Sequence, residues 1–307
     1  MRNVRTVLFV CVIALVGLSV GAEGQTLVGW GYNDYGQTNV PSGTFNAIAA
    51  CGYHNLGLRT DGTLVGWGYN EYGQTNVPSG TFTAVAGGRY HSLAIRTDGT
   101  LVGWGANWWG ETTVPSGTFS AVAAGVEHSL GIRTDGTLVG WGYNAEGQTN
   151  VPSGTFTAVA GGWDHSLGIR TDGTLVGWGS SWYGQATVPS GTFKAVAGGV
   201  YHSLGLRTDG TLVGWGYNGY GQTNVPSGTF TAIAAGFVYS LGLRTDGTLV
   251  GWGDNAHGQT NVPSGTYAAI AAGGEHSLAM TPIPEPSSLL ALGAGLLGLA
   301  GFTRRRR

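Results

Sequence analysis

The chain of 307 residues has almost no lysine, two cysteines, two methionines and only 10% charged residues. No stretch shows the 3.6-residue apolar period of an amphipathic helix, which excludes a helical bundle. Glycine contributes 58 residues, but without the every-third-residue spacing of collagen. With 11 tryptophans and 13 tyrosines, the chain is also too aromatic for a disordered protein. This composition favours strands joined by tight turns.

The two cysteines do not form a disulfide framework. Cys11 lies in the apolar segment 7–20, which follows two arginines and precedes small residues. This order is typical of a secretory signal peptide, predicted here as residues 1–22, with 23–25 as a short lead. The exported chain keeps only Cys51, so no internal disulfide forms.

Long hydrophobic runs are absent except at the two ends. The C-terminal run, residues 289–302, is shorter than the ~20 residues that span a membrane comfortably. Basic residues beyond an apolar segment are retained on the cytoplasmic side, which predicts a short transmembrane helix that inserts transiently. The flanking residues are Pro284, Glu285 and Pro286 before it and Arg304, Arg305, Arg306 and Arg307 after it.

The order Pro-Glu-Pro, short apolar helix and arginine tail over residues 282–307 resembles the PEP-CTERM sorting signal of bacteria. The resemblance implies an exosortase-type processing enzyme as partner, with cleavage near Pro-Glu-Pro. It also implies a protein that is exported across the inner membrane, anchored there, and then found in the cell envelope or extracellular matrix. An ordinary C-terminal membrane anchor is the alternative.

One unit fills the rest of the chain. The sequence TLVGW occurs seven times with a constant period of 37 residues, from Trp30 to Trp252. Such a repeat indicates a solenoid, propeller or array. Each unit contains apolar runs separated by Pro-Ser-Gly and Asp-Gly turns, which predicts three or four short strands. We therefore predict an all-β fold over residues 26–281, a seven-bladed β-propeller with four-stranded blades.

The ends of the repeat region predict how the ring closes. The first unit lacks a partner strand before Leu27–Trp30, and the last unit lacks one after Ser277–Met280. We expect these two segments to pair in one composite blade, because pairing removes two open sheet edges.

The motifs WGxNxxGQ, AxxAGxxHSLAL and DG recur in the units and resemble the regulator of chromosome condensation repeat family. The resemblance implies the propeller fold but no single activity, because propellers host unrelated functions. Eukaryotic members exchange nucleotide on a small nuclear GTPase or bind chromatin, and one secreted bacterial member inhibits β-lactamase. Export excludes the nuclear role for this chain.

Strand reversal places the Asp-Gly and Pro-Ser-Gly turns on one face, here called the turn face. Six arginines and six aspartates recur there and are expected to be turn residues in contact with each other. The YNxxGQ and GxxHS loops lie on the opposite, variable face. That face has a single base, Arg89, and eight acids: Asp34, Glu71, Glu111, Glu127, Glu146, Asp164, Asp254 and Glu275. Such a face repels nucleic acid phosphates.

The four tryptophans outside the repeated motif also fall on the variable face. Aromatic planes beside carboxylates suit sugar rings, and they equally suit a protein partner. The predicted ligand-binding residues are Trp108, Trp109, Trp163, Trp182, Tyr35, Tyr72, Asp34, Glu71, Glu127 and Asp164. In the simpler alternative, many of these aromatic side chains only cover the blade ends.

Six histidines recur once per blade, and Tyr239 takes the equivalent place in the remaining one. Equivalent ring positions are too far apart to share a zinc ion, whose nitrogen ligands lie at ~2.1 Å, so a structural role is expected. The single G-x-S-x-G match lies in the signal peptide. We predict no metal, no cofactor and no catalytic residue, with an acid–base enzyme using Asp164 or Glu127 as a weaker alternative.

These observations predict an exported, non-catalytic binding or matrix module at the bacterial cell envelope. Its acidic aromatic face would recognise a polysaccharide such as the exopolysaccharide of its host. A propeller that binds or inhibits a protein partner, and a purely structural spacer, are the alternatives.

Overall fold

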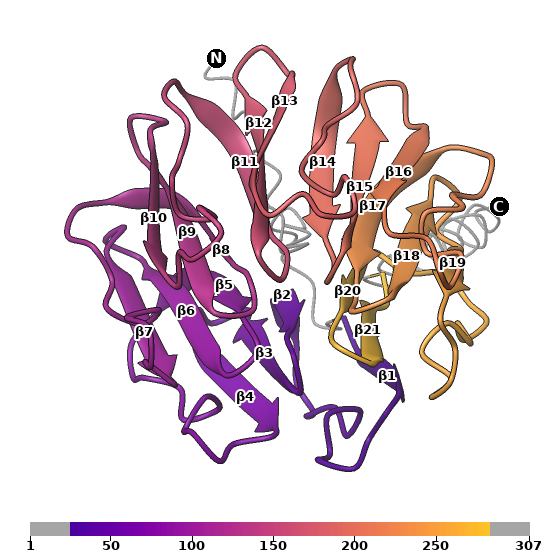
Figure 1. Ribbon diagram of the computed structural model, residues 1–307. Helices are drawn as coiled ribbons and strands as arrows, with labels where there is room; N and C mark the ends of the chain where they lie inside the picture. The colour runs from indigo at the N-terminus through magenta and orange to yellow at the C-terminus, as the bar shows by residue number, and fades with distance from the viewer. Residues whose placement is uncertain (1–24, 283–307) are drawn as a thin grey trace, which may run out of the picture.

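The computed structural model describes residues 25–282, and in this range every regular element is a strand. The strands form seven antiparallel sheets of three strands each. Figure 1 shows these sheets arranged as blades of a ring. The predicted all-β, seven-bladed propeller is confirmed.

Each blade contains an inner, a middle and an outer strand. The inner strands are β2 (Phe45–Ala50), β5 (Phe82–Gly87), β8 (Phe119–Ala124), β11 (Phe156–Gly161), β14 (Phe193–Gly198), β17 (Phe230–Ala235) and β20 (Ala269–Ala272). The middle strands are β3 (His54–Arg59), β6 (His91–Arg96), β9 (His128–Arg133), β12 (His165–Arg170), β15 (His202–Arg207), β18 (Tyr239–Arg244) and β21 (His276–Met280). The outer strands are β4 (Leu64–Gly68), β7 (Leu101–Gly105), β10 (Leu138–Gly142), β13 (Leu175–Gly179), β16 (Leu212–Gly216), β19 (Leu249–Gly253) and β1 (Leu27–Gly31).

The fourth strand that we predicted for each blade is not formed. In the segment after β4, the N–H of Thr75 donates to Oδ1 of Asn70 at 2.9 Å, and the N–H of Val77 donates to the carbonyl of Thr75 at 2.9 Å. Pro78 follows and has no N–H group. Because these donors are used locally or are missing, the segment does not form a ladder with the outer strand.

The composite blade closes the ring as predicted. β1 pairs antiparallel with β21, and the register places Leu27 opposite Met280 and Trp30 opposite Ser277. The outer strand of this blade therefore comes from the beginning of the propeller, and its inner and middle strands come from the end. The edges of β1 and β21 that face each other are therefore both paired.

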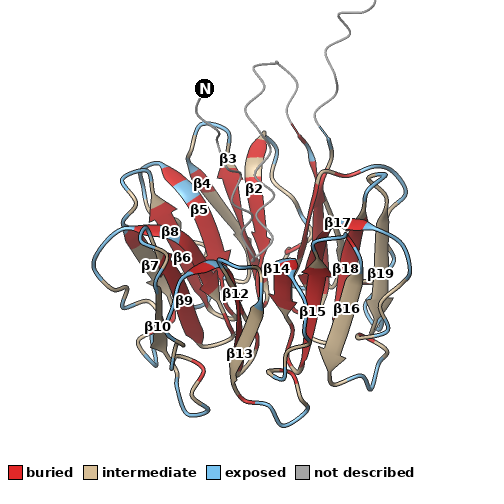
Figure 2. Cartoon of the chain, turned by 90° about the horizontal axis from the view of Figure 1, so that it is seen from above, coloured by how far each residue is buried: buried red, intermediate tan, exposed pale blue. Residues whose placement is uncertain are grey.

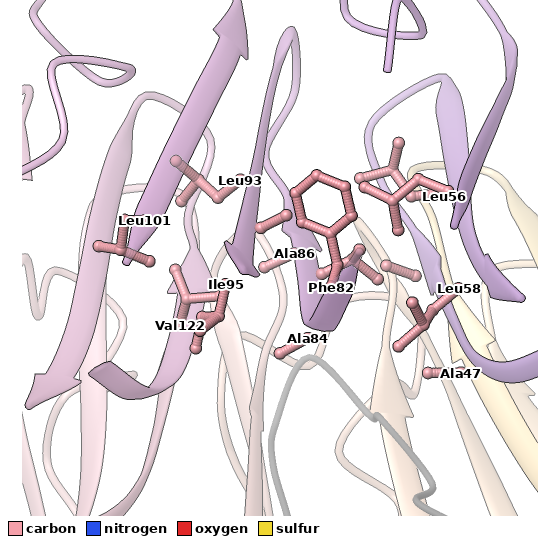
Figure 3. Packing of buried hydrophobic residues seen from close by; sticks show 14 of the residues in the cluster. Ala47, Leu56, Leu58, Phe82, Ala84, Ala86, Leu93, Ile95, Leu101 and Val122 are labelled. Atoms are coloured by element: carbon pink, nitrogen blue, oxygen red, sulfur yellow. The ribbon is translucent and has the colours of Figure 1, made fainter. Parts of the chain in front are cut away.

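The core lies between neighbouring blades. Phe82 of β5 is 3% exposed and packs in a cluster with Leu56 and Leu58 of β3 and with Leu93 and Ile95 of β6 (Figure 3). Full burial of one such side chain contributes about 1.5–3 kcal/mol. Figure 2 shows that the middle strands are buried, whereas the outer strands are partly exposed.

Small residues in the middle strands make room for these aromatic rings. A Cβ atom on Gly205 of β15 would lie 2.7 Å from Cε1 of Phe193 on the adjacent β14. A larger residue at this position would push the ring out of its place, which explains a glycine inside a strand.

The recurring histidines join each blade to the next. They are at most 1% exposed, and Nε2 of His54 lies 2.8 Å from Oγ of Ser92 in the following blade. Since the Ser92 hydroxyl donates to the carbonyl of Gln74 at 2.8 Å, the histidine nitrogen is the donor. His91, His128, His165 and His202 repeat this contact at 2.9–3.0 Å. The expected structural role of these histidines is confirmed.

On the turn face, the arginines and aspartates are turn residues but do not contact each other as expected. Arg59 donates from Nη1 to the carbonyl of Ser42 at 3.2 Å, and its guanidinium lies 5.4 Å from the centroid of the Phe45 ring. Asp61 instead accepts from the N–H and hydroxyl of Thr63 at 2.9 and 2.7 Å. Within residues 25–282, no arginine has a carboxylate within 4.0 Å.

Candidate ligand-binding site

The YNxxGQ and GxxHS loops lie together on the variable face, as predicted. The N–H of Tyr69 donates to the carbonyl of Tyr53 at 3.0 Å and ties the two loops of one blade together. Within the YNxxGQ loop, the buried Gln74 accepts the N–H of Tyr72 at 3.0 Å. Gly73 has a φ of +79°, a conformation that favours glycine. The loop is thus fixed from inside, and its variable residues point outward.

The predicted aromatic residues separate into distinct groups. Tyr35 contacts Tyr69 at 4.8 Å between ring centroids, and Tyr69 contacts Tyr72 at 6.1 Å. Tyr72 in turn contacts Trp108 at 4.8 Å, and Tyr90 packs against both. These residues form a continuous arc of edge-on rings over three blades, which we call the aromatic arc.

The other three tryptophans of the predicted site lie outside this arc. Trp109 turns away from Trp108 and packs on Tyr143 at 4.9 Å. Trp163 stacks on Tyr201 at 6.0 Å and lines the mouth of the central channel, a cavity of about 110 Å³. Trp182 is 84% exposed and has no ring contact with any described residue.

Three of the four predicted acids accept hydrogen bonds from aromatic side chains. Asp34 accepts a hydrogen bond from Tyr32, which raises the pKa of that tyrosine to about 12. Glu71 accepts from the hydroxyl of Tyr69. Glu127 accepts from Trp109, but burial and the nearby Glu111 raise the pKa of Glu127 above its usual range.

Glu111, counted among the acids of the variable face, is not at the surface. It takes the place of the loop glutamine and is 1% exposed. Its carboxylate accepts the N–H groups of Trp108 and Trp109 at 3.2 and 2.7 Å. The prediction that it contributes to an exposed acidic surface was therefore wrong, because its two oxygens hold the loop backbone.

A pocket of about 380 Å³ lies beside the fourth predicted acid, Asp164. Three successive blades supply its walls, because Glu146 follows β10, Asp164 precedes β12 and Tyr201 precedes β15. We call it the Ser180 pocket, and it is lined by Glu146, Asp164, Ser180, Trp182, Tyr183, Gln185 and Tyr201.

The pocket lies where the repeat loses a large side chain. Ser180 occupies the first position of the YNxxGQ loop, where the sequence has Tyr32, Tyr69, Tyr143 and Tyr217 in four other units. Ser180 is 7% exposed, so it forms the floor of the pocket rather than its rim. The missing tyrosine ring accounts for the space.

The pocket is lined by two carboxylates, Glu146 and Asp164, which repel each other when both are ionised. Burial and the nearby carboxylates of Glu146 and Glu127 raise the pKa of Asp164 to about 6. The side-chain amide of Gln148 donates to Asp164 at 3.3 Å, but no lysine or arginine lines the pocket.

Two neutral polar groups complete the lining. Gln185 is 1% exposed, and its Oε1 accepts the N–H of Tyr183 at 2.9 Å. Within the described part of the chain, neither its Nε2 atom nor the hydroxyl of Ser180 bonds to another protein group, and both atoms are open to solvent. Both groups are available to a ligand.

Only Asp164 and Trp182 of the predicted site residues line this pocket, and Trp163 supports it through Tyr201. The predicted set omitted Glu146, Ser180, Tyr183, Gln185 and Tyr201. A signal for them is present in the sequence, because SSWYGQ at residues 180–185 departs from YNxxGQ at its first two positions.

Across residues 25–282, no group of three or more histidines, cysteines, aspartates or glutamates is arranged to hold a metal ion. The same range contains no helix long and apolar enough to cross a membrane. The predicted anchor helix, the Pro-Glu-Pro sequence and the terminal arginines lie outside the described residues.

Solved structures share this architecture at low sequence identity. Prp20p from Saccharomyces cerevisiae superimposes with a TM-score of 0.76 at 16% identity, over 92% of this chain and 97% of its own. Human WBSCR16 gives 0.72 at 18% identity, over 84% and 99% of the two chains. The ectodomain of the Physcomitrella patens receptor kinase CR4 gives 0.64 at 24%, over 73% and 66%. At these identities the likeness shows the fold alone.

Family models match most of the chain. Residues 282–307 match the PEP-CTERM protein-sorting motif, which implies export, anchoring through the C-terminus and sorting to the cell envelope. No curated protein matches the chain at a significant level. The regulator of chromosome condensation (RCC1) repeat matches residues 45–74, 82–107, 119–148, 156–185, 193–222 and 230–259. With more than half of its residues in these matches, the chain belongs to the RCC1 repeat family.

Proposed function

We propose that this exported propeller is a non-catalytic binding module of the cell envelope, and that it binds a polysaccharide through the Ser180 pocket. The supporting observation is the composition of the pocket: an 84% exposed Trp182 stands beside two carboxylates and two unpartnered polar groups. Its volume of about 380 Å³ is within the range of small-molecule sites. Sugar rings offer an apolar face to an aromatic ring and hydroxyls to the polar groups.

The aromatic arc suits a polymer better than a single sugar. Tyr35, Tyr72 and Trp108 are 46%, 39% and 53% exposed and extend along the same face. A long chain held in the pocket has further rings to contact there, and additional weak contacts on one chain raise the overall affinity.

The second candidate is a basic protein partner on the same face. Exposed tryptophan and tyrosine side chains are common anchors of protein interfaces, and the variable face has more acids than bases. Among proteins of similar fold, Prp20p was described with its binding to Gsp1p and histones, and the same protein, yeast RCC1 (Prp20), was solved bound to Kap60. Such an interaction would weaken with salt.

The variant Ser180→Tyr tests the proposal, because four other blades carry tyrosine at this position and the fold accepts it. We expect the exported protein to bind the extracellular polysaccharide of its host in calorimetric titration, and the variant to bind at least about tenfold more weakly, a loss of 1.4 kcal/mol. Ser181→Asn is the matched control, since it also restores the repeat residue but does not line the pocket.

Unchanged affinity of Ser180→Tyr would contradict the proposed site. Cleavage of the polysaccharide by the wild-type protein would contradict the non-catalytic role and favour acid–base chemistry at Asp164. Salt-sensitive binding of basic proteins without polysaccharide binding would favour the second candidate.

We also propose that the processing partner is an exosortase-type enzyme that cleaves near Pro286 and releases the propeller from its anchor. Intact mass of the native protein in envelope and medium fractions tests this step. A product that ends near Pro286 supports it, and a chain that keeps Arg307 in the membrane fraction contradicts it.

A further inference from the structure

We propose that the Ser180 pocket selects a sugar unit with a free, positively charged amino group, such as a de-N-acetylated hexosamine. This inference rests on the proposed polysaccharide function and specifies the class of sugar. It follows from three properties of the pocket: its uncompensated negative charge, its aromatic wall and its unpartnered polar groups.

The charge of the pocket is unbalanced. Glu146 and Asp164 line it, and Glu127 is close enough to act on Asp164 electrostatically. Arg89, the single arginine of the variable face, lies 4.9 Å from the Tyr90 ring centroid and 5.9 Å from that of Trp163, and it acts on Glu127. An ammonium group in the pocket would therefore supply a positive charge that no side chain lining it provides.

The aromatic wall suits the same group. Tyr183 and Tyr201 line the pocket, with ring centroids 5.1 Å apart and an angle of 49° between the ring planes. Trp163 stacks on Tyr201 at 6.0 Å between ring centroids. An aromatic ring attracts a cation that approaches its electron-rich face, and Trp182 adds a further ring to the lining.

The two unpartnered groups favour a sugar over a bare ammonium ion. The hydroxyl of Ser180 and Nε2 of Gln185 belong to side chains that are 7% and 1% exposed. Both polar atoms are open to solvent, so a ligand that displaces solvent there has to supply hydrogen bonds of its own. Ring hydroxyls next to the amino group can do so, whereas uronate or phosphate groups would be repelled by Glu146 and Asp164.

Three hexamers with the same linkage test the inference: glucosamine, N-acetylglucosamine and glucose, each titrated calorimetrically at pH 6 into the exported protein. We expect the glucosamine hexamer to bind at least about tenfold more tightly than the other two. Equal affinity for all three would overturn the selection of an ammonium group and leave polysaccharide binding standing. Failure of these hexamers and of the host polysaccharide to bind would overturn the proposed function itself.

Charge variants distinguish the effect of the pocket carboxylates from that of the negative potential over the whole variable face. Glu146→Gln and Asp164→Asn each remove one pocket charge, and Asn at position 164 keeps an oxygen for the amide of Gln148. Asp254→Asn is the matched control, because Asp254 lies on the same face outside the pocket and accepts from the amide of Gln259, as Asp164 accepts from that of Gln148. We expect the two pocket variants to lose most of the preference for glucosamine and the control to keep it. An equal loss in Asp254→Asn would overturn the local site.

Discussion

The Nε2 atom of His276 lies 2.7 Å from Oδ1 of Asn55, and this contact joins the last blade to the first. At the other five histidines the partner is a serine hydroxyl. Asn55 fulfils both functions of that serine, because its Nδ2 atom donates to the carbonyl of Gln37 at 2.8 Å. The seam of the ring is thus closed by side chains in the interior as well as by the pairing of β1 with β21.

The first prediction concerns this seam. We expect Asn55→Ala to lower the free energy of unfolding by about 1–3 kcal/mol, because it leaves the donor of His276 buried without a partner. The carbonyl of Gln37 also loses one of its two donors and keeps only Nε1 of Trp67. Asn55→Ser, which places the residue of the other blades at the seam, should cost less. Urea unfolding followed by tryptophan fluorescence measures both. Equal stability of Asn55→Ala and the wild type would mean that this contact does not hold the seam.

The second prediction is a steep loss of stability in acid. Burial lowers the pKa of the six recurring histidines of the middle strands from 6.5 to about 3 or 4. Below about pH 6.5 these histidines take up protons in the unfolded chain but not in the folded chain. The contribution of the neutral histidines to the free energy of unfolding is therefore full above pH 6.5 and is lost as the pH falls toward 4.

Urea midpoints measured between pH 7 and pH 4 follow this loss. The variant His91→Gln removes one of the six groups, and its midpoint should fall less steeply with pH even if its stability at pH 7 is lower. A midpoint that stays constant from pH 7 to pH 5 would show that the histidines are not kept neutral by the fold.

The third prediction concerns the outer strand of the composite blade. A chain that begins at Tyr32 lacks β1 and leaves β21 with an unpaired edge. We expect it to self-associate in size-exclusion chromatography and to unfold at lower temperature, since open edges pair with other chains. A chain that begins at Gln25 keeps β1 and is the control. Monomeric behaviour of the shorter chain would contradict the importance of this closure.

The fold was predictable because each repeat carries its own strand and turn signals. The constant period indicated the number of blades, and the incomplete units at Thr26 and Thr281 indicated the composite blade. The missing fourth strand was not predictable in this way. It depends on local hydrogen bonds of residues such as Thr75 and Val77, which the apolar pattern does not encode.

The site was less predictable, because residue type alone does not reveal where a side chain points or how deeply it is buried. Trp108 and Trp109 are neighbours in the chain, yet one joins the aromatic arc and the other packs on Tyr143. Glu111 is an acid by type but a buried loop residue by position. The Ser180 pocket arises from a side chain that is absent, and a search for conspicuous residues misses it.

The last prediction is a dependence of ligand affinity on pH. Asp164, with a pKa of about 6, is mostly protonated at pH 5 and mostly ionised at pH 7. A trimethylated glucosamine oligomer keeps its positive charge throughout this range. Because a cation prefers the ionised carboxylate, its affinity should rise about tenfold from pH 5 to pH 7.

Calorimetric titrations at several pH values measure this rise, and two variants identify its origin. Asp164→Asn should bind the oligomer with an affinity that changes little with pH, because the titrating group is gone. Asp254→Asn should keep the rise, because Asp254 is outside the pocket. A wild-type affinity that is constant between pH 5 and pH 7 would mean that the ammonium group does not contact Asp164, since ionisation of a contacting carboxylate must change the binding free energy.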